Sequence, residues 1–382
     1  MINVDPRVPA YDLVDKYIRL TAPRLVVYPC PREHNPFIEL LFPVAFSHVV
    51  AMNSILALAA AHSGSPHSRF LYGAALADLR SALQQDSIGT EVLVATMMLV
   101  FFETAEGHSK RQAIQHLQGL ARLLKFRRQR GAQTLHDGLA MEVLIYHVVT
   151  ISIYDNLSQT ILKGLRISPT GPTVWSNIGG DLRQSYCLSG LSSEVLDFIL
   201  EITGLFSPSP EAHTPLPAML IVEGIALADK INQWQPAIAG DSLFPYALDA
   251  TNHAELTLAA VLWKNAAFLN LLSLMHGKKI SPDDARIAEV VKGSMITLQQ
   301  IPEHSSVETC LNWPLVMIGS FAISQQDRSL LRRRFNSMEW LIFKNVYIAI
   351  SILEEAWAQF DEYGTVNLET VMQIPPFDVI LS

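Results

Sequence analysis

The chain has 382 residues, of which 49% are hydrophobic and only 17% are charged. This balance supplies enough apolar surface for a large core and excludes an intrinsically disordered chain. The net charge of −8 is opposite in sign to the basic footprint of a domain that grips nucleic acid through its phosphates. We therefore expect no direct contact with nucleic acid.

The most apolar window covers residues 44–61 and raises the question of a membrane helix. It is short for a span of about 20 residues, and it contains Ser47, His48 and Asn53. These features favour a buried core helix, so we expect no membrane span. Residues 1–17 are mixed polar and lack the apolar region of a signal peptide.

Apolar residues recur at helical spacing through the first 162 residues. The expected helices cover residues 11–21, 36–62, 70–85, 90–106, 110–128 and 134–162. The second of them is either one long helix or two helices broken near Pro43. The amino-acid composition then changes. Residues 168–190 are rich in Pro, Gly and Ser, which predicts a long ordered loop.

Helical spacing resumes after this loop and continues almost to the end of the chain. The expected helices cover residues 193–205, 216–234, 251–276, 281–301, 314–322, 328–335 and 338–360, with loops at 206–215 and 237–245. The sequence thus predicts an all-α fold of about a dozen packed helices. We expect one large helical domain over residues 15–362, between a tail at 1–14 and a tail at 363–382.

The three cysteines, Cys30, Cys187 and Cys310, are far apart and odd in number. This usage indicates buried thiols in a reducing compartment and excludes a disulfide scaffold. No CxxC or HExxH pattern is present, so we expect no metal site.

No catalytic or cofactor motif emerges from the sequence. GxSxG, GxGxxG and the phosphate-binding loop pattern are missing. The adjacent carboxylate pairs, 283–284 and 354–355, diverge by about 100° on a helix and cannot act as a general acid and base. We therefore assign no catalytic residue and no cofactor. An enzyme that works by shaping a pocket with scattered polar groups stays open.

Two basic clusters, at residues 125–130 and 332–334, each end a helical pattern. Cations at a helix C-terminus complement its dipole, which favours solvated helix ends. A nuclear import signal is the more specific alternative. The sequence leaves both interpretations open, solvated helix ends and an import signal.

Residues 311–322 read LNWPLVMIGSFA. Pro314 suits the first turn of a helix, where its missing N–H costs nothing. Trp313 would fix the entry of the chain by burying a large apolar surface, and Gly319 would allow a close helix approach.

Eight segments together resemble the fungal-specific transcription factor domain that follows zinc binuclear cluster modules, in the variant that includes sterol uptake control and acriflavine sensitivity control proteins. They are TAPRL at 21–25, NPF at 35–37, SILALAAAH at 54–62, LYGAALADLRSAL at 71–83, ATMMLVFFETAEG at 95–107, HLQGLARLL at 116–124, LWKNAAFLNL at 262–271 and NWPLVMIGSFA at 312–322. The resemblance covers about residues 15–360, and their common order makes it specific.

The resemblance implies a regulatory domain in the nucleus, but the family's DNA-binding module needs six cysteines in a short run. Only Cys30 lies in the first 180 residues, so zinc and DNA contacts are carried over to no residue here. We expect a transcription regulator that acts through other transcription factors or as a dimer, controls specialised-metabolite genes, and responds to a lipophilic effector. Trp175, Trp263 and Trp313 are the candidate pocket residues. The alternative is a small-molecule-binding protein or a cofactor-free cyclase or isomerase on the same fold.

Overall fold

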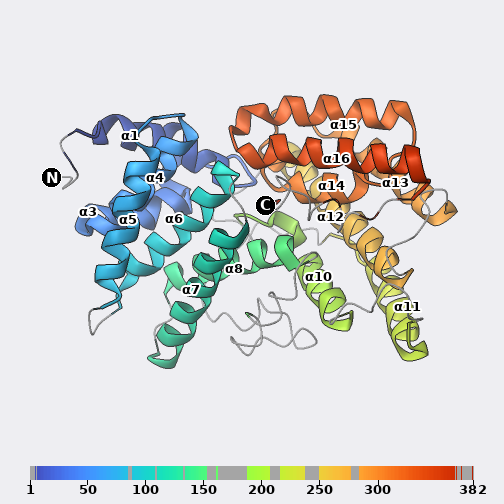
Figure 1. Cartoon of the computed structure of the whole chain (residues 1–382), viewed down its shortest axis with the longest axis horizontal. Helices are drawn as coiled ribbons and strands as arrows, with labels where there is room; N and C mark the ends of the chain where they lie inside the picture. The colour runs from blue at the N-terminus through green and yellow to red at the C-terminus, as the bar shows by residue number, and fades with distance from the viewer. Residues whose placement is uncertain are drawn as a thin grey trace.

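The computed structural model describes residues 5, 7–84, 88–107, 110–131, 134–152, 161, 187–206, 216–236, 249–276, 284–365, 367, 371 and 381. Within these residues the regular elements are all helices, and no strand occurs. The all-α prediction is therefore confirmed. Figure 1 shows the helices in two adjoining groups, which we call the N-terminal and the C-terminal group.

The N-terminal group is built around α4 and α6. Its helices are α1 (Ala10–Lys16), α2 (Pro36–Glu39), α3 (Leu41–Ser47), α4 (Val49–His62), α5 (Ser68–Ala82), α6 (Thr90–Glu106), α7 (Lys110–Gln129) and α8 (Leu135–Ser152), with the short turns η1 (Tyr17–Thr21), η2 (Ala22–Leu25) and η3 (Arg32–His34). Helix α4 packs against α5 and α6, and α6 packs against α7 and α8. Both central helices are apolar on all sides, as expected of helices surrounded by others.

The C-terminal group is built around α12. Its elements are η6 (Gly190–Ser192), α10 (Ser193–Leu205), α11 (Ala218–Gln233), α12 (Ala250–Met275), α13 (Ala285–Gln300), η7 (Ser306–Cys310), α14 (Asn312–Gly319), α15 (Gln325–Ser337), η8 (Met338–Leu341) and α16 (Lys344–Tyr363). Helix α12 is long and apolar enough to cross a membrane, but 61% of its most apolar window is buried against other parts of the chain. Its neighbours include α11, α13 and α14, so it serves as a core helix.

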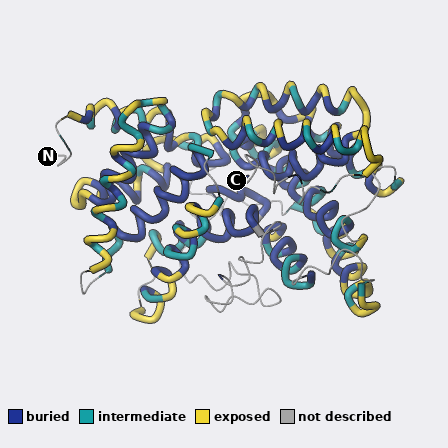
Figure 2. Tube along the Cα trace, viewed as in Figure 1, coloured by how far each residue is buried: buried dark blue, intermediate teal, exposed yellow. Residues whose placement is uncertain are grey.

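One continuous core joins the two groups. Helix α6 contacts α16, α8 contacts α10, and η2 contacts η7. Figure 2 shows buried positions passing from one group into the other, and the buried hydrophobic residues form a single cluster. The first helix begins at Ala10, inside the expected tail, and Val8 and Leu13 belong to this core. The predicted domain boundaries stay predictions.

The apolar stretch 36–62 forms three helices rather than one or two. The interruptions lie at Leu40 and His48, and His48 is extended with φ −137° and ψ 120°. Pro43 lies inside α3 as its third residue and does not break it. The expected break near Pro43 thus lies at Leu40, and Pro43 falls in the first turn of the next helix, where it has no N–H partner within the helix to lose. The second interruption, at His48, was not predicted.

The stretch 338–360 also differs from the predicted single helix. A short 3₁₀ turn, η8, ends at Leu341, and α16 begins only at Lys344. Between them Ile342 has φ +61°, which is left-handed backbone that β-branched residues rarely adopt. Periodicity cannot reveal such a turn, because the apolar spacing continues through it.

The Trp-Pro segment behaves as predicted. Pro314 is the third residue of α14, and Trp313 is fully buried. A Cβ on Gly319 would lie 2.9 Å from a methyl group of Leu353, so a larger residue would force the side chains packed here to shift. The Gly319 carbonyl also accepts a hydrogen bond of 2.8 Å from Trp357 Nε1.

Candidate functional site at the junction of the two groups

The two groups meet where η2 and the end of α4 face the connection between η8 and α16, a region that we call the junction. His62, the last residue of α4, lies at its centre. Its Nδ1 is 3.0 Å from Thr21 Oγ1 and its Nε2 is 2.7 Å from the Leu341 carbonyl. The ring also stacks on Phe343, with 5.1 Å between ring centroids.

These contacts fit a neutral imidazole at the junction, the form that burial favours. Nε2 donates to the Leu341 carbonyl, which leaves Nδ1 to accept from the Thr21 hydroxyl. Burial lowers the pKa of His62 to about 4, and the nearby Arg24 charge acts in the same direction. His62 therefore fixes the end of α4 to the backbone just before the left-handed Ile342.

A second set of contacts holds the beginning of α16. Lys344 Nζ is 2.8 Å from a carboxylate oxygen of Glu106, at the end of α6. Gly107 follows with φ +60°, and a Cβ there would lie 2.9 Å from Ile348 Cδ1. The absence of a side chain at Gly107 thus lets α16 pack closely on the end of α6.

The junction encloses a cavity of about 30 Å³, which has room for about one or two water molecules. Both groups and the segment between them contribute to its wall. It is lined by Arg24, Leu25, Val27, Phe101, Thr104, Tyr146, His147, Leu188, Thr309 and Phe343. We call it the junction cavity.

Arg24 supplies the only cationic side chain among the described residues that line the junction cavity. One guanidinium nitrogen donates to the Leu20 carbonyl at 3.0 Å, and the guanidinium carbon lies 5.5 Å from the centre of the Trp340 ring. The buried Nε has no hydrogen-bond partner within the described chain. Burial lowers the pKa of Arg24. Placing this charged group in the cavity wall therefore costs solvation free energy.

Helix α8 brings three buried polar groups to the same region. His147 Nδ1 donates to the Val143 carbonyl at 2.7 Å, and burial lowers the pKa of His147 to about 4. Burial raises the pKa of Tyr146 well above its usual value. One turn earlier, burial raises the pKa of Glu142 to about 7, although several hydrogen bonds to its carboxylate oppose this shift.

Glu142 fastens the chain where it re-enters the core at residues 187–189. Its carboxylate accepts from the Leu188 N–H at 2.8 Å, the Ser189 N–H at 3.3 Å and the Cys187 thiol at 3.2 Å. The Cys187 carbonyl in turn accepts from the Val27 N–H at 2.8 Å. One buried carboxylate thus positions Leu188 in the cavity wall.

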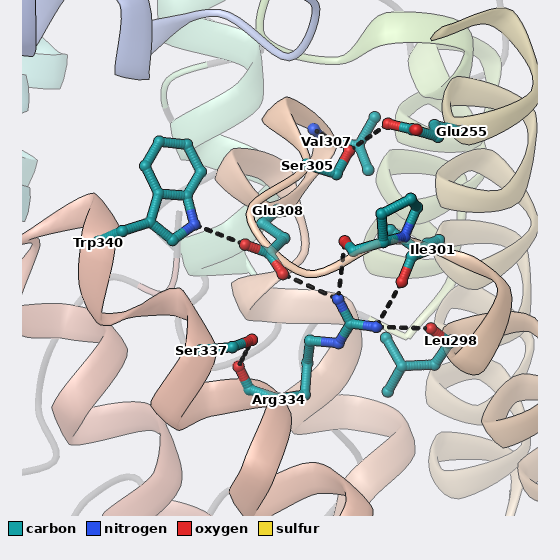
Figure 3. A network of polar contacts seen from close by, with 10 residues as sticks. Glu255, Leu298, Ile301, Ser305, Val307, Glu308, Arg334, Ser337 and Trp340 are labelled. Atoms are coloured by element: carbon teal, nitrogen blue, oxygen red, sulfur yellow. Dashed lines mark hydrogen bonds and ion pairs between the residues drawn. The ribbon is translucent and has the colours of Figure 1, made fainter. Parts of the chain in front are cut away.

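A buried ion pair supports the junction from the C-terminal group (Figure 3). Arg334 Nη1 is 2.8 Å from Glu308 Oε1, and Glu308 Oε2 accepts from Trp340 Nε1 at 2.6 Å. The guanidinium also donates to the carbonyls of Leu298, Ile301 and Pro302. We call these contacts the Arg334 network.

The Arg334 network has two structural roles. It caps the C-terminal end of α13, whose last carbonyls have no partner within the helix. Through Glu308 it also holds Trp340, which stacks on Arg24 at the cavity. Arg334 is 6% exposed at its side chain, so the interpretation of residues 332–334 as a solvated helix end is wrong for Arg334.

The predicted pocket residues lie close to the cavity but are not all described. Trp263 and Trp313 are buried and stack on each other with 4.8 Å between ring centroids. Neither is among the described residues that line the cavity. The Trp263 ring centroid does lie 5.9 Å from that of Tyr146, a cavity-lining residue. Trp175 lies outside the described residues. A ligand role for these tryptophans stays a prediction.

A histidine and a carboxylate converge elsewhere, between α5, α6 and α7. The Tyr72 hydroxyl donates to Glu103, and His116 Nε2 lies 3.3 Å from Tyr72 and 3.9 Å from Glu103. None of the three lines the junction cavity. No Asp or Glu stands among the described residues of the cavity wall, and the described residues include no group of three or more His, Cys, Asp or Glu that could hold a metal ion.

Three of the eight segments that carried the family resemblance meet at the junction. Arg24 and Leu25 belong to TAPRL, and His62 ends SILALAAAH. Phe101 and Thr104 belong to the segment that ends at Gly107. Residues far apart in the sequence are therefore brought together around one cavity.

Comparison with protein families agrees with this arrangement. The model of the fungal specific transcription factor domain matches residues 12–376, which is nearly the whole chain. The chain belongs to this family. Its role is therefore in the regulation of transcription. No curated protein and no solved structure matches the chain.

The residues that form the junction were not singled out from the sequence. Arg24, Phe101 and Thr104 belong to segments that carried the family resemblance. Those segments were the only sequence feature that could have pointed to these three residues. Glu142 and His147 lie in an apolar helical stretch, where a lone polar residue gives no hint of its partners. Each contacts a residue 46 positions away in the sequence. The Glu142 carboxylate accepts from the Leu188 N–H, and the His147 ring packs edge-on against Phe101.

Proposed function

We propose that this chain regulates transcription in the nucleus through protein partners, and that a small lipophilic effector controls it at the junction. The partners would be other transcription factors or a second copy of the chain, and the controlled genes would belong to specialised metabolism. Membership of the fungal transcription factor domain family supports the regulatory role. The junction cavity supports the effector.

Protein contacts are favoured over direct DNA contacts by the composition of these 382 residues. They contain three cysteines, fewer than the six of a zinc binuclear cluster, and their net charge is −8. Phosphate contacts need Lys and Arg, and a net negative surface repels DNA. Arg334 and Arg127, one from each basic cluster, are already held by Glu308 and Asp137.

The observation that carries the effector proposal is the composition of the cavity wall. Arg24 from η2, Thr104 from α6 and Phe343 from the start of α16 all line one cavity, so a molecule bound there would contact both groups. At about 30 Å³ the cavity is too small for a lipophilic effector, so binding would separate α16 from the N-terminal group. The left-handed Ile342 stores backbone strain at the hinge of such a movement.

Deleting the gene in its host, with neighbouring transcripts and metabolites measured together, tests the regulatory role. We expect neighbouring transcripts to change sharply, with metabolites following them. Unchanged transcripts with one accumulating intermediate would contradict the proposal and favour the enzyme alternative. A regulatory response that stays unchanged in Thr104→Leu, which occupies part of the cavity, would argue against an effector at the junction.

A further inference from the structure

A large groove lies between α10 and α11, and it shares no described lining residue with the junction cavity. Its volume is about 530 Å³, and it is lined by Glu201, Gly204, Leu205, Glu223, Ala226, Leu227 and Lys230. Figure 1 shows the two helices projecting together from the C-terminal group towards the lower edge of the view. We call it the α10–α11 groove.

The groove arises from the same residue pattern on both helices. Glu201, Gly204 and Leu205 stand at positions i, i+3 and i+4 of α10, and Glu223, Ala226 and Leu227 repeat this order on α11. Residues at this spacing share one helix face. The small residues leave the space, the leucines give it an apolar floor, and the carboxylates stand at its edge.

The apolar part of the groove continues along α11. Met219 and Val222 lie one turn before Glu223 and Ala226, on the same face of the helix. Each is 66% exposed, although both are hydrophobic. The face of α11 that packs against the rest of the chain is formed by the buried Gly224, Leu227 and Ile231, and it borders the groove face at Leu227.

Two carboxylates, Glu201 and Glu223, and one basic residue, Lys230, line the groove. Helices α10 and α11 carry five carboxylates and one basic residue, Lys230. Lys230 Nζ is 2.9 Å from Glu201 and 5.3 Å from the centre of the Phe198 ring, so the groove already holds one ammonium group between a carboxylate and an aromatic ring. Glu223 is exposed and makes no ion pair within the described chain.

We propose that the α10–α11 groove binds a basic amphipathic helix of a protein partner. Its apolar residues would enter between Gly204 and Ala226 and extend over Val222, and its Lys or Arg residues would pair with Glu223 and the neighbouring carboxylates. This is the helix-in-groove mode of recognition, with charge complementarity that selects the partner. The proposal rests on the proposed function, because it names the surface through which the regulator contacts its partner.

The binding test uses designed peptides and the full chain. A labelled helical Leu/Lys peptide, with leucines at i, i+3, i+4 and i+7, is titrated by fluorescence anisotropy against a Leu/Glu peptide of the same pattern. We expect the basic peptide to bind at least tenfold more tightly, and its affinity to fall as salt is added. Equal affinity for the two peptides would overturn the proposal.

Paired variants locate the binding. Glu223→Arg with Ala226→Leu reverses one charge and fills the groove at exposed positions of α11. Ala288→Leu with Glu289→Arg makes the same chemical changes on the exposed face of α13. We expect the first pair of substitutions to weaken binding of the basic peptide at least tenfold, and the second pair to leave its affinity unchanged. Equal effects of the two pairs would overturn the proposed site.

The oligomeric state and the host distinguish the remaining outcomes. Sedimentation of the full chain tests docking of a second copy. Dimerisation of the parent that the Glu223→Arg, Ala226→Leu variant abolishes would overturn a separate partner. In the host, the groove variant should reproduce the transcript change of the deletion. If deletion changes transcripts and the groove variant does not, the groove proposal fails while the regulatory role stands; if deletion changes none, the regulatory role itself fails.

Discussion

The junction and the α10–α11 groove use charged residues in opposite ways. In the Arg334 network at the junction, the buried Arg334 is held by Glu308 and three carbonyls of the chain itself. At the groove the carboxylates stand at an open surface, and one of them, Glu223, has no ion pair within the described chain. Substitutions at the junction should therefore act on stability, and those at the groove on binding.

The largest expected effect on stability is at the Arg334 network. Arg334→Met leaves Glu308 charged and fully buried without its counter-ion, and leaves the carbonyls at the end of α13 without a donor. We expect a loss of about 3–5 kcal/mol in the free energy of unfolding, measured by urea denaturation.

Arg332→Met is the matched control in the same basic run. The Arg332–Glu354 pair is 2.5 Å long, but its side chains are 40% and 47% exposed. Exposed pairs contribute about 0–1 kcal/mol, so this variant should stay within about 1 kcal/mol of the parent. Similar losses in the two variants would mean that the Arg334 network does not hold the junction as described.

The next effect is the acid sensitivity of the buried histidines. His147 has a pKa of about 4 in the folded chain, against about 6.5 when unfolded. The unfolded chain therefore takes up the proton first, and stability is lost as the pH falls from about 6.5 towards 4. His62 adds to this loss, whereas Glu142, with its raised pKa of about 7, opposes it by becoming neutral on acidification.

His147→Leu should reduce this acid sensitivity. Between pH 7.5 and pH 5 the parent should lose about 2 kcal/mol more than the variant, because one histidine contributes about 1.4 kcal/mol per unit of pKa difference. Urea denaturation at the two pH values measures the difference. An identical loss in both proteins would show that His147 takes up its proton in the folded chain.

A smaller effect separates packing from backbone strain at two glycines. Gly107 and Gly131 both have positive φ, but a Cβ on Gly107 would touch Ile348 of α16, whereas one on Gly131 would meet nothing within 4 Å. Both alanine variants should lose about 1–2 kcal/mol from strain. Gly107→Ala should lose about a further 1–3 kcal/mol from overpacking at the junction. Equal losses by thermal denaturation would argue against close packing of α16 there.

The smallest effect on stability is expected at the groove. Glu223→Arg and Ala226→Leu change exposed positions, so together they should shift the free energy of unfolding by less than about 1 kcal/mol. A large loss, measured by urea denaturation, would mean that these positions support the fold, which would contradict the separation of roles between the two regions.

Much of the fold could be predicted from helical spacing, because most of its helices bury one apolar face or are apolar all round. The errors lie where the local backbone conformation decides, as at His48 and Ile342, which interrupt the helices but leave the apolar spacing unchanged. The stacked pair Trp263 and Trp313 shows the limit for the site: each residue is prominent in the sequence, but their contact depends on how α12 and α14 pack.

The groove shows a different limit. The pattern Glu-x-x-small-Leu is visible at residues 201–205 and 223–227, but it has meaning only once α10 and α11 are known to lie side by side. Each helix alone is an ordinary amphipathic helix with a few exposed apolar residues. The juxtaposition of two such faces is tertiary information, which single-sequence periodicity does not contain.

The most direct test of regulation through protein contacts is a tethered reporter in the host. The 382-residue chain is fused to an unrelated DNA-binding module, and expression is measured from a promoter that carries only that module's site. The account predicts a clear change in expression with the parent chain, and none with the Glu223→Arg, Ala226→Leu variant at equal protein level. Expression that stays at the level of the DNA-binding module alone, with the fusion folded and in the nucleus, would contradict it.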